Sequence, residues 1–115
     1  MGERRAGVWE KEVVRPLRAR YTPEAAAIIR KLHPRTKRLV REGIRALIEN
    51  PLLGHELQLE LAGFRSYRVK SYRIIYAINE TGGSLDVHFV GQRRDVYESF
   101  RDLLTKRLAP DEEEA

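Results

Sequence analysis

The segment from Ser66 to Tyr97 constrains the fold most, because apolar residues and cations alternate along it in short runs. Apolar residues at every second position are typical of one face of a β-strand. In the first two runs these residues are Tyr67, Val69, Tyr72, Ile74, Tyr76 and Ile78. If Lys70 and Ser71 form a two-residue hairpin loop, Arg68 lies directly across from Arg73, where like charges repel. The pattern predicts a sheet with one core face and one cationic face, and it indicates an anionic partner.

A third strand and a short helix complete this half of the chain. The alternation after a turn at residues 80–83 predicts a strand that extends the hairpin into an antiparallel meander. Its apolar residues Leu85, Val87 and Phe89 alternate with Asp86 and His88. Further on, Asp95 and Glu98 have the spacing of a capping box. The helix expected there buries Val96, Phe100, Leu103 and Leu104 and places Tyr97 in its first turn.

The residues before the sheet predict one strand and two helices. The strand is expected within Val8–Tyr21, at a sheet edge or broken in two, because Pro16 has no N–H for a central ladder. A helix is expected to begin at Thr22, a good N-cap, since Pro23 fits the first helical position. A second helix is expected at residues 35–49. This order of strand, αα-hairpin, three-stranded antiparallel meander and short C-terminal helix predicts an α/β (α+β) fold, with the helix pair on one face of the sheet.

Length and composition predict a single domain. The chain has 115 residues, of which 42% are hydrophobic, enough for one core and too few for two. We expect residues 1–110 to form one domain with a loose N-terminal leader, and residues 111–115 to be an acidic disordered tail. There is no cysteine for disulfides or thiolate chemistry. No apolar run approaches the roughly 20 residues that span a bilayer, so we expect a soluble, cytoplasmic protein.

Outside the tail the chain is strongly basic. The net charge is +5, but four acidic residues, Asp111 and Glu112–Glu114, lie among the last five positions. Residues 1–110 therefore carry 22 basic and 13 acidic groups, a net charge of +9. Such an excess suits RNA or DNA, because phosphate neutralisation releases counterions. A well-solvated surface is the alternative, and the clustering of arginine in the sheet favours nucleic acid.

No pattern indicates a metal or a nucleotide cofactor, and none is expected. The histidines, His33, His55 and His88, are scattered without metal-ligand spacing. The glycine pair Gly82-Gly83 lies in a predicted hairpin turn and does not precede a helix, as a phosphate-binding loop would.

Six short motifs carry a family resemblance by their order and spacing. They are YTPEA at residues 21–25, ENP at 49–51, LAG at 61–63, SYRV at 66–69, YRIIY at 72–76 and VGQRRDVY at 90–97. Together they cover residues 17 to about 104. The chain resembles the RelE/ParE-type toxins of type II toxin–antitoxin systems, closer to the RelE-like mRNA interferase branch. The resemblance implies a RelE-like fold, a cognate antitoxin protein as partner and a possible toxin–antitoxin hetero-oligomer.

The resemblance also implies an activity and a site. RelE-like members are ribosome-dependent endoribonucleases that cleave mRNA, without a metal, by attack of a ribose 2′-hydroxyl on the adjacent phosphate, and so inhibit translation. Carried over by position, the catalytic residues are Arg68, Lys70, Arg73, Arg93 and Tyr97. Two alternatives stay open because fold alone does not decide function. One is a ParE-like DNA gyrase inhibitor that acts by protein–protein binding, and the other is a non-catalytic antitoxin-binding module of the same fold.

The chemistry of the cleavage suggests a role for each residue. The three arginines suit the phosphate and the charge of the transition state, because a guanidinium grips phosphate and hardly ever deprotonates. Lys70 is the candidate base, since an amine among guanidinium groups loses its proton more readily. Tyr97 is expected to stack on a base or to hydrogen-bond the phosphate. For protonation of the leaving oxygen the resemblance suggests Arg93, with His88 as a remote alternative.

Four of the five candidates also have a purely structural interpretation. Arg68 and Arg73 would then pair with helix carboxylates such as Glu98 or Asp102. Lys70 would be an ordinary turn residue, and Tyr97 a core aromatic.

Overall fold

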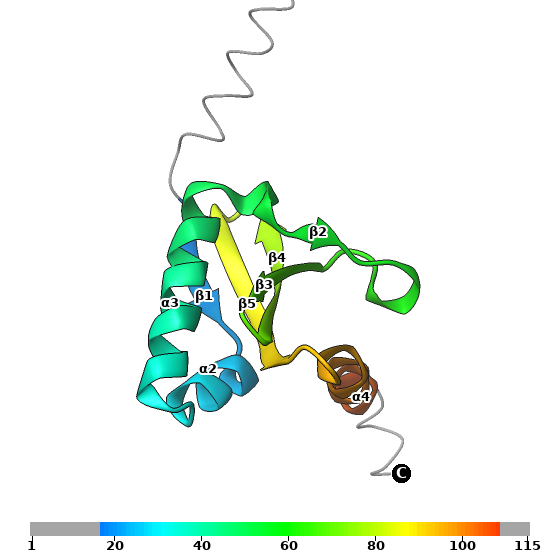
Figure 1. The fold of residues 1–115 in the computed structure, drawn as a ribbon. Helices are drawn as coiled ribbons and strands as arrows, with labels where there is room; N and C mark the ends of the chain where they lie inside the picture. Colours follow the sequence, from blue (N-terminus) through cyan, green and yellow to red (C-terminus); the bar gives the residue numbers. More distant parts are fainter. Residues whose placement is uncertain (1–16, 109–115) are drawn as a thin grey trace, which may run out of the picture.

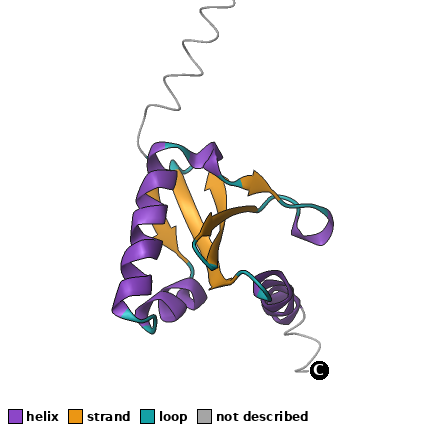
Figure 2. Cartoon of the chain, viewed as in Figure 1, coloured by secondary structure: helices purple, strands orange, loops and turns teal. Residues whose placement is uncertain are grey.

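The computed structural model describes residues 17–108, which form a five-stranded sheet with helices on both faces (Figures 1 and 2). In chain order the elements are β1 (Arg18–Tyr21), α2 (Pro23–Arg30), α3 (Pro34–Glu49), the 3₁₀ turn η1 (Pro51–Leu53), β2 (His55–Glu56), the 3₁₀ turn η2 (Leu59–Leu61), β3 (Arg65–Val69), β4 (Tyr72–Asn79), β5 (Ser84–Gln92) and α4 (Val96–Leu108). The strand order is β1-β5-β4-β3-β2, with β1 parallel to β5 and all other pairs antiparallel. The predicted α/β (α+β) architecture is confirmed.

The first strand is shorter in the described residues than the sequence pattern suggests. β1 pairs only with β5, so it lies at the edge of the sheet, as Pro16 led us to expect. The part of the predicted strand before Leu17 lies outside the described residues, as do the predicted leader and the acidic tail.

Both helices of the predicted pair begin at side-chain caps. The Thr22 hydroxyl accepts a hydrogen bond from the Ala25 N–H at 3.1 Å, and it donates to the His88 carbonyl on β5 at 3.2 Å. His33 caps α3, its Nδ1 accepting from the Arg35 N–H at 3.1 Å. Figure 1 shows α2 across the N-terminal end of α3, while α3 runs along the sheet. The caps therefore fix where the two helices start against the first face of the sheet.

The main core lies between these helices and the sheet. Its buried residues are Ala25, Ile29, Val40, Ile44, Leu47, Ile74, Tyr76, Leu85, Val87 and Val90. The hairpin residues Tyr67, Val69, Tyr72 and Ile78 pack against it, as the period-two pattern predicts. The α3 helix approaches the sheet closely at Gly43, where a Cβ atom would lie 2.8 Å from Val69 Cγ2.

The second face of the sheet is not wholly cationic, which corrects the sequence-based expectation. A smaller core of Leu61, Ile75, Val96 and Phe100 lies there, with Leu57, Phe64, Phe89, Tyr97, Leu103 and Leu104 packed against it. The helix α4 and the loop before β3 cover this face. The cations are confined to its margin near the β3–β4 turn, because the centre is needed to hold α4.

A β-bulge changes the side on which β5 places its side chains. Ile75 pairs with Phe89 and Tyr76 with Val87, so His88 is the extra residue on β5. Beyond the bulge the alternation reverses, so Val90 joins the main core and Phe89 joins the second core. The prediction that Phe89 shares a face with Leu85 and Val87 is therefore wrong.

The strand β2 has no counterpart in the prediction. It contains only two residues, which pair with Ser66 and Arg65 of β3. So short a strand leaves no alternating pattern to read. Within residues 17–108, no helix has the length and apolar character needed to cross a bilayer.

Candidate functional site

The candidate site is built on the β3–β4 hairpin, whose register agrees with the prediction. Arg68 faces Arg73 and Val69 faces Tyr72, so Lys70 and Ser71 form a two-residue turn. Lys70 has φ +57°, and Ser71 is not among the residues with positive φ, which is the pattern of a type II′ turn. The Arg68 Nε donates to the Lys70 carbonyl at 3.2 Å. The turn therefore presents one lysine and one arginine together, both exposed.

Arg93 is brought to this turn by a backbone hydrogen bond. β5 ends at Gln92, which pairs with Tyr72 at the start of β4. The next residue donates its N–H to the Ser71 carbonyl at 2.7 Å. Arg93 is exposed and lies beside the turn that carries Lys70. Two segments more than 20 residues apart in the sequence thus meet at one corner of the sheet.

Tyr97 joins the corner from the first turn of α4. Its ring centre lies 5.9 Å from the guanidinium carbon of Arg73, a cation–π distance. Its hydroxyl shares a 3.0 Å hydrogen bond with the Ser66 Oγ on β3. The ring also packs against the second core. Tyr97 is therefore partly the core aromatic of the structural interpretation, with one face turned to a candidate arginine.

Arg73 is the most enclosed of the candidate cations. Its Nε is buried and has no hydrogen-bond partner among the described residues. Ion pairs in the described part of the chain are Arg65–Glu56, Arg101–Glu60 and Arg107–Glu24. Neither Arg68 nor Arg73 pairs with a carboxylate of α4 within the described residues, so this structural interpretation is not observed there.

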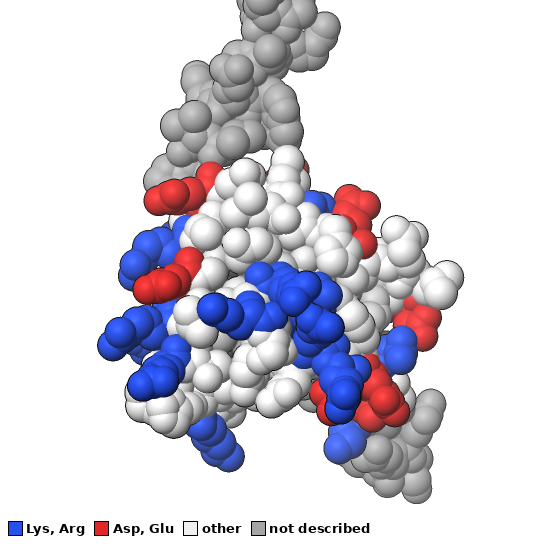
Figure 3. Space-filling model, viewed as in Figure 1, with Lys and Arg blue, Asp and Glu red and all other residues white. Residues whose placement is uncertain are grey.

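All five sequence-predicted site residues are thus placed at or beside one corner, which we call the basic corner: Arg68, Lys70, Arg73, Arg93 and Tyr97. Figure 3 shows a band of Lys and Arg side chains over β3 that continues toward α4. Four cations that lack a described carboxylate partner can hold a phosphate and the charge that develops on it. Within residues 17–108, no group of three or more histidine and carboxylate side chains is placed to hold a metal ion.

Ser66 is the site residue that sequence reasoning missed. It is fully buried on β3, opposite Ile75, and its hydroxyl fixes that of Tyr97. The sequence signal for Ser66 is a small polar residue on the strand face that packs on the second core. This signal could not be read from the sequence because the second core was not predicted.

His88 does not belong to the basic corner. Its ring lies against Phe64, with centroids 4.9 Å apart, and against Phe100 at 6.3 Å. Burial lowers its pKa below the ordinary 6.5, and repulsion by Arg107 lowers it further. His88 and Arg93 are five positions apart, and along a strand this separation corresponds to about 16 Å. The distance does not support His88 as the acid for a phosphate held at the corner.

Comparison with known proteins now identifies the family. A family model described as "ParE toxin of type II toxin-antitoxin system, parDE" matches residues 19–97. The toxin–antitoxin complex RelBE2 from Mycobacterium tuberculosis contains a chain that is 34% identical, with a TM-score of 0.64. That similarity covers 68% of this chain and 99% of the other. The chain belongs to the RelE/ParE family of type II toxins. The family resemblance seen in the motifs is therefore confirmed.

More distant members of the RelE/ParE family share the fold. The isolated RelE toxin of E. coli is 16% identical with a TM-score of 0.60, over 76% of this chain and 98% of that one. The chromosomal ParDE system of P. aeruginosa contributes a chain at 12% identity and a TM-score of 0.54, over 66% of this chain and 95% of that one. The search among curated proteins gives no match. Both branches of the family are thus represented among the structural neighbours.

Proposed function

We propose that this toxin is a ribosome-dependent endoribonuclease that cleaves mRNA and so inhibits translation. The observation that carries the proposal is the basic corner, where three separate segments bring four cations and Tyr97 together. The Arg93–Ser71 backbone hydrogen bond of 2.7 Å fixes that meeting. The cytoplasm, where ribosomes translate, would be its place of action.

Each residue of the basic corner has a role in the proposed cleavage. A ribose 2′-oxygen attacks the adjacent phosphorus, the bond from phosphorus to the 5′-oxygen breaks, and a 2′,3′-cyclic phosphate and a 5′-hydroxyl result. Arg68, Arg73 and Arg93 hold the phosphate and stabilise its additional negative charge. Enclosed Arg73 is already oriented by Tyr97, so less of its motion is lost when phosphate binds.

The proton transfers involve Lys70 and Arg93. Lys70 takes the 2′-hydroxyl proton, which requires bound RNA to exclude water from a side chain that is exposed in the free protein. Arg93 donates a hydrogen bond to the leaving 5′-oxygen, the position that the family resemblance suggests for it, and this oxygen takes its proton from a water molecule at the exposed edge of the site. Tyr97 stacks on a neighbouring base with the part of its half-buried ring that neither Arg73 nor the second core covers.

We further propose that a cognate antitoxin binds this chain and holds it inactive in a hetero-oligomer. The similar chains from Mycobacterium tuberculosis and E. coli are described as parts of toxin–antitoxin complexes, RelBE2 and RelBE. An acidic or amphipathic antitoxin segment over the basic corner would compete directly with RNA.

Inhibition of DNA gyrase is the second candidate function, because the matching family model is that of ParE. This function needs protein–protein binding and no catalysis. Cations that have no carboxylate partner among residues 17–108 gather around one tyrosine, which phosphate chemistry requires and protein binding does not. We therefore place the ribonuclease first.

The test adds purified toxin to a bacterial translation extract and maps new mRNA 5′ ends, with a ribosome-free reaction as control. We expect discrete cuts within codons that appear only when ribosomes are present. Intact message together with inhibition in a gyrase supercoiling assay would replace this proposal by the second one.

A further inference from the structure

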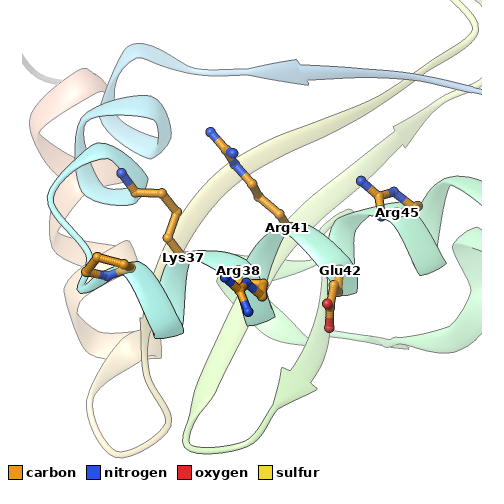
Figure 4. A pocket seen from close by; sticks show the side chains of 6 residues that line it. Lys37, Arg38, Arg41, Glu42 and Arg45 are labelled. Atoms are coloured by element: carbon orange, nitrogen blue, oxygen red, sulfur yellow. The ribbon is translucent and has the colours of Figure 1, made fainter.

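The outer face of α3 carries cations that the basic corner does not use. A groove of about 370 Å³ lies along it, lined by Pro34, Lys37, Arg38, Arg41, Glu42 and Arg45. Figure 4 shows Lys37, Arg41 and Arg45 on one side of the helix, with Glu42 pointing away from them. We call these three residues the α3 row. Because they follow one another at four-residue intervals, the row is about 12 Å long.

The α3 row does not stabilise the helix that carries it. The positive end of the helix dipole is at the N-terminus of α3, and the first turn contains no acidic residue to offset it. Like charges four residues apart on a helix repel one another. None of the three residues pairs with a described carboxylate within 4.0 Å. Because the three cations of the α3 row do not stabilise the described fold, we look for their role in binding an anion from outside it.

The lining of the groove restricts the kind of anion. It contains no aromatic residue, whereas proteins that bind single strands stack the bases on aromatic rings. Apart from Pro34 every lining residue is charged, so the groove lacks the apolar anchors of a protein interface. A straight row of cations on a rigid helix matches the regular phosphates of a duplex, which proteins recognise largely by shape.

We propose that the α3 row binds the phosphate backbone of double-stranded RNA. The choice of RNA over DNA rests on the proposed ribonuclease function. The apolar side of α3, which lies next to the row, packs on the main core over the first face of the sheet, while the basic corner lies at the margin of the second face. Figure 3 shows the cations along α3 apart from the band over β3. The row therefore holds a folded RNA while the corner receives a neighbouring single strand.

The test measures binding of the full chain to a fluorescent RNA hairpin at several salt concentrations. The double variant Arg41→Gln/Arg45→Gln removes two members of the row. The control Arg101→Gln/Lys106→Gln removes the same charge from exposed positions of α4. We expect the row variant to bind about tenfold more weakly or worse at about 0.1 M salt, and its salt slope to fall by roughly 1 to 2. The control should bind like the parent chain.

A second variant and a stability measurement make the result decisive. Lys37→Gln alone should lower the salt slope by about 1. Thermal unfolding of the row variants should occur at the parent temperature or above, since like-charge repulsion is removed. Unchanged RNA affinity in both row variants, or an equal loss in the control, would overturn the proposal.

Other ligands are compared in the same experiment. Tighter binding of a single strand or of a DNA hairpin would overturn the duplex RNA assignment. Row variants that bind RNA normally but no longer bind the antitoxin would also overturn this assignment. Because this experiment measures binding and not cleavage, it tests the two proposals separately. If the row binds duplex RNA but the chain cuts no message, the ribonuclease proposal is wrong and the present inference holds.

Discussion

At the scale of single residues, Lys70 occupies a backbone position that favours glycine. Its φ of +57° is the left-handed region, which costs an L side chain about 1–2 kcal/mol. The side chain is exposed, and it makes no hydrogen bond or ion pair within residues 17–108 that would offset that cost. A lysine kept at this position supports its assignment to the basic corner.

We predict that Lys70→Gly makes the protein more stable and less active. Glycine removes the backbone strain but loses more freedom on folding, so the net gain is about 0.5–1 kcal/mol. Thermal unfolding measures the gain, and the translation-extract assay measures the lost cleavage. Ser71→Gly is the matched control, since Ser71 has no positive φ and only the entropic loss applies. A Lys70→Gly protein no more stable than the control would contradict the account of the turn.

His88 makes stability depend on pH. Its folded pKa lies below 6.5, first because burial disfavours the imidazolium and then because Arg107 repels it, with Asp86 and Glu24 opposing. Below about pH 6.5 the unfolded chain therefore binds more protons than the folded one, and the free energy of unfolding falls as the pH falls. At higher pH both states are neutral at His88 and the effect vanishes.

We predict that the unfolding temperature of His88→Gln depends less on pH than that of the parent chain between about pH 7 and about pH 5.5. The carboxyl of Glu24 does not interfere in this window. Its pKa is lowered from the ordinary 4.5 by its own backbone N–H and by Arg107, so its stabilisation is lost only at lower pH. Parallel pH profiles for the parent and the variant would show that His88 is not the titrating group.

The site residues differ in how far the sequence could identify them. Arg68 and Arg73 were placed opposite each other correctly, because a two-residue turn leaves one register. Ser66 was missed because its importance depends on Tyr97, 31 positions away, and on a core that the pattern did not reveal. Local periodicity predicts which face of a strand a residue lies on. A hydrogen bond between segments far apart in the sequence can be identified only once the fold is known.

At the scale of elements, the Tyr76 hydroxyl joins the segment after α3 to the sheet. It donates to the Pro51 carbonyl at 2.6 Å and accepts from the Gly54 N–H at 3.2 Å and the Arg65 Nε at 3.3 Å. The residue is fully buried. This one hydroxyl therefore connects η1, the start of β2, and β3.

We predict that Tyr76→Phe lowers the free energy of unfolding by about 1–3 kcal/mol, because three groups lose a partner away from water. Tyr72→Phe is the control, since no hydrogen bond of the Tyr72 hydroxyl is found in the described residues and its loss should be near neutral. Chemical denaturation measures both variants. Equal stability of the two would show that water replaces the lost hydroxyl.

The elements themselves were largely predictable, and their exceptions have physical causes. Helix starts were found at Thr22 and near His33 because capping and proline are local signals. Phe89 was placed on the wrong face because strict alternation cannot register a bulge at His88. The strand β2 was missed because it has two residues and depends on β3 for its hydrogen bonds.

At the scale of the whole molecule, the two faces of the sheet have different tasks. The first face carries α2 and α3 over the main core, and it leaves the α3 row outside. The second face holds α4 through Phe100 and the smaller core, and thereby sets Tyr97 beside Arg73. An ion pair between Arg107 and Glu24 ties the end of α4 to the start of α2. The basic corner depends on that docking of α4.

The ends of the cleaved RNA test the central claim most directly. Message cut in the ribosome should carry a 2′,3′-cyclic phosphate on one fragment and a 5′-hydroxyl on the other. The rate should fall by about 10² or more in Arg93→Ala, since a cation facing the phosphate is lost, and stay near the parent value in Arg94→Ala, the adjacent exposed arginine. Fragments with a 3′-hydroxyl and a 5′-phosphate, or equal rates in the two variants, would contradict catalysis by the basic corner.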